Sequence, residues 1–296
     1  MQSRSPRSSF DPVKRVGTYC ILIAWSVICA FPLYWVGITS IKNTDQIDGG
    51  PTYIPFWDFL PSLDAWRFIL FDAAENLVSR AVNSMIIAVC STLATLLLGG
   101  MAVYGITRFT HRFSSFALMS MILSTRILPP VVMALPLYVL AQRTGTFDSL
   151  SALIFIYTAI NLPIAIWMLA PVFGPRATEQ EEAANLDGAS YFHIFFFILV
   201  PMIKTSVIAV GLLVFIQCWN EYLFAVYLTS DHALTIPPWM VGQLSIKEAQ
   251  TGGGAEELAH LAAATVVMAL PVLLLTIFAQ RSLTGVLRAG ARHKTS

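Results

Sequence analysis

The sequence predicts an all-α membrane protein with six transmembrane helices, and three observations support this fold class. Of the 296 residues, 56% are hydrophobic and only 12% are charged, whereas an average soluble domain carries roughly 25% charged residues. Six apolar segments are long enough to cross the hydrocarbon core, which takes about 20 helical residues each. No stretch has the composition of a water-soluble domain. We therefore expect a single transmembrane domain over residues 1–296.

The predicted spans follow the apolar stretches of the chain in order. The apolar run of the first is too long for a signal peptide, and no A-x-A cleavage pattern follows it, so we expect it to stay as an N-terminal helix. Prolines inside the spans are compatible with helices, because neighbouring helices re-satisfy the freed carbonyl groups. About five helices within 83–281 should form the core. The expected spans are 17–39, 83–106, 115–141, 150–171, 203–228 and 261–281.

The positive charges predict the orientation, because Lys and Arg concentrate in cytoplasmic loops. With both termini in the cytoplasm, the inner segments hold twelve of the 18 Lys and Arg residues and the outer loops hold five. Arg126 is the remaining one and lies within a span. This asymmetry predicts that both termini are cytoplasmic. The hydrophilic pieces are then an inner loop at 172–202 and outer loops at 40–82 and 229–260.

Composition and motifs exclude several classes of function. A net charge of +1 gives no electrostatic case for nucleic acid. The chain has no G-x-x-x-x-G-K-[ST] phosphate loop and no H-E-x-x-H or G-x-S-x-G pattern. Its four cysteines form no C-x-x-C pair. We therefore expect no catalytic residue, no metal site and no cofactor in this chain.

The inner loop carries the most informative motif, E-A-A-N-L-D-G at residues 182–188. Thr178 or Glu179 can cap a short helix whose acidic start suits the helix dipole. The two alanines present a small face that another protein can approach closely, and Gly188 suits a left-handed turn that ends the helix. An amphipathic stretch from Tyr191 to Phe197 follows. These residues are equally compatible with an ordinary capped interfacial helix.

The spacing of this loop resembles the cytoplasmic motif of permease subunits of binding-protein-dependent ABC importers. That motif is E-A-A, three further residues, glycine, nine further residues, and then I-x-L-P. Here Val200 replaces the usual leucine. Weaker matches at 31–42, 124–130 and 280–290 are similar to sugar permeases, in particular the smaller permease subunit of maltose-type importers. The residues that fill the motif are Glu182, Ala183, Ala184, Gly188, Ile198 and Pro201.

The resemblance implies the type I ABC importer permease fold in a bacterial inner membrane, and the import of a sugar or related carbohydrate. It implies a second permease subunit, two ATPase subunits that bind ATP and magnesium, and an external substrate-binding protein. The inner loop would dock on an ATPase subunit, and the outer loop with three glycines would reach the binding protein; a plain flexible linker is the alternative. The docking residues would be Glu182, Ala183, Ala184, Asp187 and Gly188, and the loop residues Gly252, Gly253 and Gly254.

Several polar and aromatic residues within the spans are candidates for the substrate pathway. Aromatic faces and amides suit a hydroxylated substrate, although some of these aromatics also fit an interfacial belt. The intramembrane charges Arg126 and Glu221 are costly in lipid. We expect them to pair with each other or to bond to backbone carbonyl groups, rather than to contact substrate. The pathway candidates are Asn161, Trp167, Trp219, Asn220 and Tyr222.

Other functions remain open from the sequence. An ion-coupled secondary transporter would show an inverted repeat with helices broken at matching positions, and no such symmetry is visible. An isolated membrane enzyme is the third class. Within the importer class, the substrate could also be a polyol, a glycerol phosphate or a uronate oligosaccharide.

Overall fold

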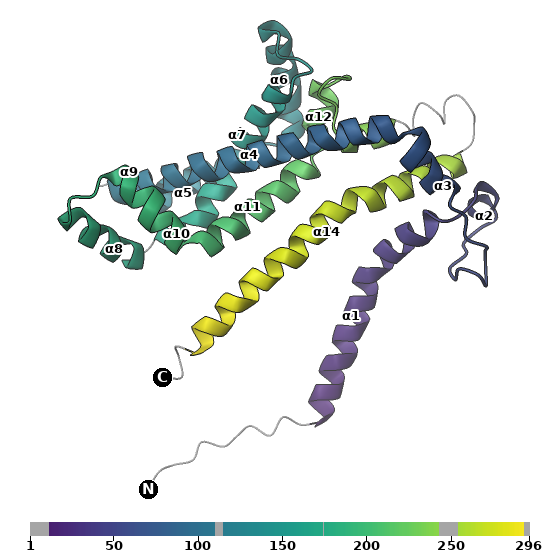
Figure 1. The fold of residues 1–296 in the computed structure, drawn as a ribbon, viewed down its shortest axis with the longest axis horizontal. Helices are drawn as coiled ribbons and strands as arrows, with labels where there is room; N and C mark the ends of the chain where they lie inside the picture. The colour runs from purple at the N-terminus through teal and green to yellow at the C-terminus, as the bar shows by residue number, and fades with distance from the viewer. Residues whose placement is uncertain (1–11, 110–114, 174, 243–253, 293–296) are drawn as a thin grey trace. The chain divides into compact units, whose positions relative to one another are not determined.

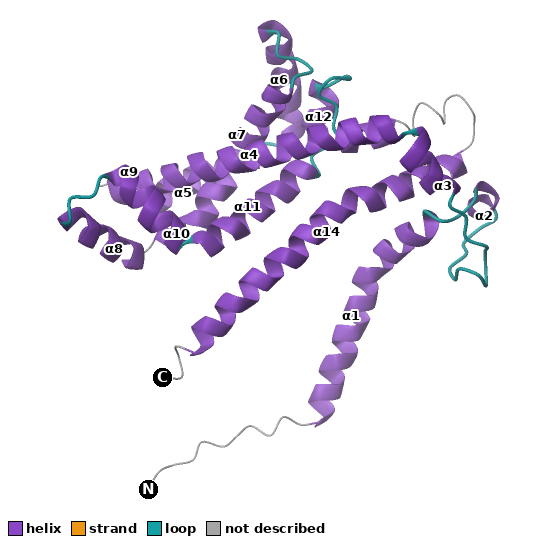
Figure 2. Cartoon of the chain, in the orientation of Figure 1, coloured by secondary structure: helices purple, strands orange, loops and turns teal. Residues whose placement is uncertain are grey.

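A computed structural model describes residues 12–109, 115–173, 175–242 and 254–292. Helices dominate these residues, as Figure 2 shows, and within them the only β-type pairing is an isolated bridge between Pro55 and Phe59. By length and composition, four of the helices can cross a membrane, or up to six if each of two bent helix pairs counts as one span. The predicted six spans agree with the second count in number. However, its second bent pair joins Tyr191–Met202 to Lys204–Trp219, whereas the predicted span is 203–228.

Four helices are long and mostly straight candidates for spans. They are α1 (Pro12–Thr39), α4 (Ala74–Phe109), α7 (Leu150–Leu169) and α14 (Gly254–Arg292). α4 and α14 begin earlier than predicted, so the ends of the expected outer loops 40–82 and 229–260 are helical. Hydropathy detects only the apolar length of a helix that lies inside the membrane. The polar first turns of both helices lie outside that length.

The span predicted over 115–141 is broken. It consists of α5 (Ser115–Ser124), a 3-10 turn (Thr125–Ile127) and α6 (Pro130–Thr144), and the two helical arms meet at 81°. Two consecutive prolines explain the break, because each lacks an N–H group and disfavours a helical residue before it.

The span predicted over 203–228 is also two helices. α11 (Lys204–Trp219) ends before Asn220, and α12 (Leu223–Leu228) starts separately. On its other side α11 meets the helical stretch 191–202 at 83°. That stretch consists of α9 (Tyr191–His193), a π-helical segment η4 (Ile194–Leu199) and α10 (Val200–Met202).

The chain forms two compact units, and the first comprises residues up to Asp72 with 244–267. In this unit α1 leads into a folded segment rather than the plain loop expected after residue 40. Its helices are α2 (Thr44–Asp48), α3 (Asp64–Arg67) and the π-helical turn η1 (Phe68–Asp72).

Lys42 contacts three separate parts of this unit. Its Nζ donates to the carbonyl oxygen of Thr52 at 2.7 Å and lies 4.8 Å from the Trp35 ring centroid and 5.0 Å from that of Phe59. Burial lowers the pKa of Lys42, and the nearby Asp58 carboxylate partly offsets that effect. Cation–π contacts and one hydrogen bond thus compensate a buried ammonium group.

The second unit, residues 73–243 with 268–296, is built around α4. α4 packs against α7 and α11, and these two also contact each other; Figure 1 shows α4 and α11 running side by side. Small residues allow the close approach, since a Cβ atom on Gly211 would come within 2.9 Å of Leu96 Cδ1 and one on Gly99 within 3.4 Å of Ala165 Cβ. Close packing at small residues is the usual basis of helix association in lipid.

Polar contacts gather at both ends of α4. Near its start Arg80 forms an ion pair with Asp231, and Asn83 donates to the carbonyl oxygens of His232 and Leu234. Near its end Tyr104 and Arg108 bind Glu181. Tyr104 lies 21 positions after Asn83, which corresponds to about 32 Å along a helix. This length matches the roughly 30 Å of a hydrocarbon core, so the two clusters lie where the membrane surfaces are expected.

Asp148 ties the turn between α6 and α7 to the segment after α12. Its carboxylate accepts five hydrogen bonds, from the backbone N–H groups of residues 230–233 and from the Ser230 hydroxyl, at 2.9–3.1 Å. Partial burial would raise the pKa of Asp148, but these donors outweigh it and hold the pKa well below its usual range. The residue also adopts a positive φ of 56°, which Asp tolerates better than most residues.

We predict that Asp148→Ala destabilises the folded chain by about 1–2 kcal/mol, because several charge-assisted hydrogen bonds are lost from a partly exposed site. Asp148→Asn keeps the backbone conformation and should cost less. Because the pKa of Asp148 is lower in the folded chain than in the unfolded chain, its stabilising effect is fully present above the unfolded pKa and is lost only as the pH falls through the folded pKa. The stability difference between the wild type and Asp148→Ala should therefore be constant across neutral pH. The melting temperature of the detergent-solubilised protein measures it; an unchanged value for Asp148→Ala would contradict the role.

Candidate functional site

The motif of the inner loop lies on α8 (Pro175–Leu186) and the turn that ends it. The helix begins at Pro175, where a missing N–H costs nothing, so Thr178 and Glu179 lie inside the helix and the predicted caps are wrong. The predicted left-handed turn is confirmed, because Gly188 has φ +79°. The N–H of Ala189 donates to the Ala184 carbonyl and that of Gly188 to the Asn185 carbonyl. This pair of bonds is a Schellman motif.

α8 has an inward and an outward face. Glu181 and Ala184, one turn apart, are buried, so Ala184 does not present the partner-facing surface that the sequence predicts. The outward face consists of Glu179, Glu182, Ala183 and Leu186, all exposed. Leu186 is 90% exposed and was not predicted as a site residue. The sequence signal for it was an apolar residue on the exposed face of an otherwise polar helix.

Glu181, beside the motif, makes the strongest contacts of α8. One carboxylate oxygen accepts a hydrogen bond from the Tyr104 hydroxyl at 2.7 Å, and the other pairs with Arg108 Nε. Both partners lie near the end of α4. Sequence analysis attributed the function to Glu182 and did not consider its neighbour, although Arg108 at the inner end of a predicted span pointed to an acidic partner.

Aromatic rings hold the two segments that flank α8. The ring of Tyr104 lies 6.4 Å from that of Phe173, in the 3-10 turn η3 (Ala170–Phe173) before the helix, and 5.5 Å from that of Phe195 in η4 after it. Phe173 and Phe195 stack on each other at 6.4 Å. Gly100 leaves room for this cluster, because a Cβ there would lie 3.3 Å from the Phe195 ring.

The two intramembrane charges neither pair with each other nor bond to backbone carbonyl groups in the contacts of the described residues, so both expected arrangements are wrong. Arg126 is exposed and donates to the side-chain oxygen of Gln217 at 3.2 Å. Glu221 accepts from the Tyr157 hydroxyl at 2.5 Å and from the backbone N–H groups of Phe224 (2.9 Å) and Ala225 (3.1 Å). Glu221 therefore caps α12, which explains why a helix can restart inside the predicted span.

The pathway candidates divide into buried and exposed groups. Asn161 and Trp219 are buried in the core: Asn161 Nδ2 donates to the Tyr157 carbonyl at 2.8 Å, and Trp219 Nε1 donates to the Met268 carbonyl at 3.0 Å. Among the described residues, the buried Oδ1 of Asn161 has no hydrogen-bond partner, and the assignment of both residues to the pathway stays a prediction. Asn220 and Tyr222 are exposed at the break between α11 and α12.

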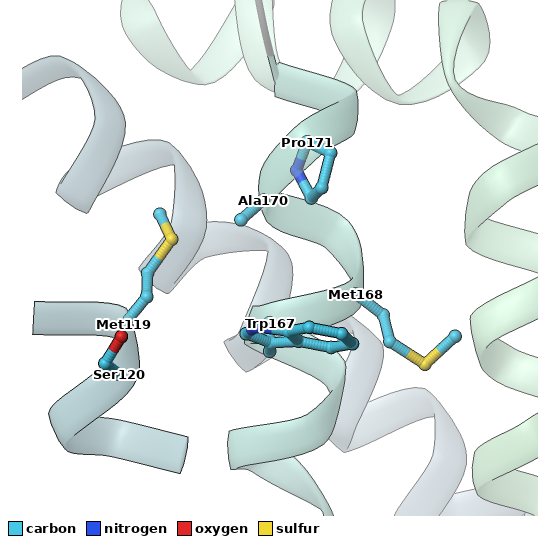
Figure 3. Close-up of a pocket in the computed structure, with 6 residues that line it drawn as sticks. All are labelled: Met119, Ser120, Trp167, Met168, Ala170 and Pro171. Carbon is cyan, nitrogen blue, oxygen red and sulfur yellow. The ribbon is translucent and has the colours of Figure 1, made fainter. Parts of the chain in front are cut away.

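Trp167 borders a hollow of about 520 Å³ between α5 and the end of α7 (Figure 3). The lining is mostly apolar, with the Ser120 hydroxyl and the Trp167 indole N–H as its polar side-chain groups, and two methionines contribute flexible side chains. The assignment of Trp167 to the substrate pathway stays a prediction. The lining residues are Met119, Ser120, Trp167, Met168, Ala170 and Pro171.

The glycine-rich loop lies largely outside the described residues. This applies to Gly252 and Gly253, whereas Gly254 is the first residue of α14 and thus helical. Within the described ranges, three or more His, Cys, Asp or Glu side chains do not gather as a metal ion would require.

Comparisons with known proteins agree with this architecture. The chain is 31% identical over 275 residues to the diacetylchitobiose uptake system permease protein NgcG of Streptomyces coelicolor, covering 92% of this chain and 87% of the relative. It is 27% identical over 282 residues to the trehalose/maltose transport system permease protein MalG of Thermococcus litoralis, covering 95% and 98%. A bacterial ABC transporter involved in the import of the acidic polysaccharide alginate has the same fold, with TM-score 0.70, 16% identity and coverage of 95% and 99%.

The family match covers most of the chain, residues 95–288. It includes α8 with its motif, the broken pair α5–α6 and the interrupted helices α11 and α12. The chain belongs to the family of binding-protein-dependent transport system inner membrane components.

Proposed function

We propose that this chain is a permease subunit of an ATP-driven importer that carries a carbohydrate across the inner membrane. The relatives named for diacetylchitobiose and for trehalose and maltose support the substrate class, since they match over nearly the whole chain. ATP and magnesium would be bound by partner ATPase subunits. A second permease subunit and an external binding protein would complete the importer.

The observation that carries the proposal is the outward face of α8. Glu182 and Ala183 provide a charge and a small surface, and Leu186 leaves an apolar side chain 90% exposed to water. A single exposed leucine is common on protein surfaces, so its significance comes from its place on the helix that carries the E-A-A motif, beside the exposed Glu182 and Ala183. We place this helix in the cytoplasm, as the Lys and Arg distribution favours, where an ATPase subunit would cover it.

The substrate pathway would run past the broken helices. Arg126, Gln217, Asn220 and Tyr222 are all exposed at or near the two breaks. Exposed polar groups at this depth are costly in lipid, so this face would line a water-filled path or meet the second permease. Irregular backbone at membrane depth is tolerated in such places.

An acidic carbohydrate is the second candidate substrate, and Arg126 is the observation that favours it. Its guanidinium contacts the neutral Gln217 amide, and among the described residues no carboxylate forms an ion pair with it. A guanidinium group can bind a carboxylate through two parallel hydrogen bonds.

Glu182→Lys and Gly188→Val should abolish uptake and weaken attachment of the ATPase subunits while leaving membrane insertion normal. The first reverses a charge on the outward face of α8, and the second strains a left-handed residue by about 1 kcal/mol and re-aims the turn. Gln180→Lys, which adds the same positive charge beside that face, is the matched control. Gly188→Asn should retain more uptake, because Asn tolerates positive φ. Co-purification with the ATPase subunits is the measurement, and wild-type attachment in both mutants would contradict the docking role.

A strain lacking this chain should lose ATP-dependent uptake of one class of carbohydrate. A labelled panel of a neutral disaccharide, a polyol, a glycerol phosphate and a uronate oligosaccharide identifies that class. Arg126→Gln should reduce uptake of the uronate oligosaccharide selectively if the acidic candidate is right. Uptake that survives depletion of ATP but collapses with the ion gradient would contradict the importer and favour a secondary transporter.

A further inference from the structure

We infer that Glu181, held by Tyr104 and Arg108, is the positioning residue that transmits movement of α8 to the transmembrane helix α4. This inference rests on the proposed function, in which an ATPase subunit docks on the outward face of α8. It assigns to Glu181 a role distinct from that of its neighbour: Glu182 would meet the partner, whereas Glu181 would connect the docked helix to the spans.

The geometry of Glu181 determines how α8 is held. The residue is 5% exposed, and its two oxygens are bound by different residues of α4, by Tyr104 at 2.7 Å and by Arg108 Nε. A carboxylate bound at both oxygens constrains rotation of α8 about its own axis as well as its distance from α4. Glu181 is buried on the face opposite Leu186, so a load on the outward face reaches α4 through this carboxylate.

The segments before and after α8 also contact α4. Tyr104 contacts Phe173 before α8 and Phe195 after it, while its hydroxyl binds Glu181 on α8 itself. Three consecutive parts of the loop therefore meet one side chain of α4. From there α4 continues across the membrane in contact with α7 and α11. Such a contiguous chain of packed groups can carry a rigid-body movement from α8 to the spans.

The chemistry of the contact fits positioning better than stabilisation. A buried ion pair is often no more stabilising than well-packed apolar residues of the same volume. It does, however, specify one arrangement, because removing either partner leaves a buried charge uncompensated. Among the described residues, the buried Nη2 of Arg108 has no hydrogen-bond partner, so loss of Glu181 would leave its guanidinium still less satisfied.

The test measures ATP hydrolysed per sugar transported by the complete importer in proteoliposomes, with its binding protein present. Glu181→Gln and Arg108→Gln should each keep the ATPase subunits attached but raise the ATP used per sugar by about tenfold, as expected for residues of a coupling network. The double variant should also raise the ATP used per sugar by about tenfold rather than about a hundredfold, since the two groups act as one unit. Wild-type ratios in both single variants, or effects that multiply, would overturn the inference.

Tyr104→Phe is a second test in case the charge variants fail to fold, because it removes only the hydroxyl group and keeps both charges. It should raise the ATP used per sugar in the same direction, by about twofold to fivefold, at a normal membrane level. An unchanged ratio in this variant would overturn the inference. Failure of the proposed function looks different: Glu182→Lys would then retain its ATPase subunits, whereas failure of the inference alone leaves Glu182→Lys defective and Glu181→Gln fully coupled.

Discussion

Charged and amide side chains on a helix that crosses lipid cost least near its two ends, and α4 carries its strongest polar contacts there. Its start binds the segment 231–234 through Arg80 and Asn83, and its end binds Glu181 through Tyr104 and Arg108. The interval between them is filled by small and apolar residues that let α7 and α11 pack closely. The rest of the second unit is arranged around this one helix.

The charged residues are of two kinds, those at the end of α4 and those within the predicted spans. Glu181 and Arg108 pair at the end of α4, where their cost is limited and their geometry is specific. Glu221 is satisfied inside the bundle by capping α12, and Arg126 is exposed with a neutral partner. Connection to an ATPase subunit and passage of a substrate would thus depend on different charged groups in different parts of the molecule.

The sequence predicted the features that depend on composition and local spacing. Membrane class, the number of spans, the motif on α8 and the left-handed Gly188 all follow from residues close together in the chain. It did not predict contacts between distant residues. Neither expected arrangement of Arg126 and Glu221 occurs, and the role of Glu181 was missed because its partners lie 73 and 77 positions away. The restart of a helix at Leu223 also depends on tertiary context, since its cap Glu221 is itself held by Tyr157.

The central claim is that the outward face of α8 is the surface through which this permease is driven. Its most direct test is cross-linking in the assembled importer, using a variant without native cysteines that carries Leu186→Cys and a short bifunctional reagent. The account predicts an adduct with the ATPase subunit from Leu186→Cys, with a yield that changes when ATP binds, and none from the buried Ala184→Cys. An intact importer that gives no adduct from Leu186→Cys, or equal adducts from both positions, would contradict it.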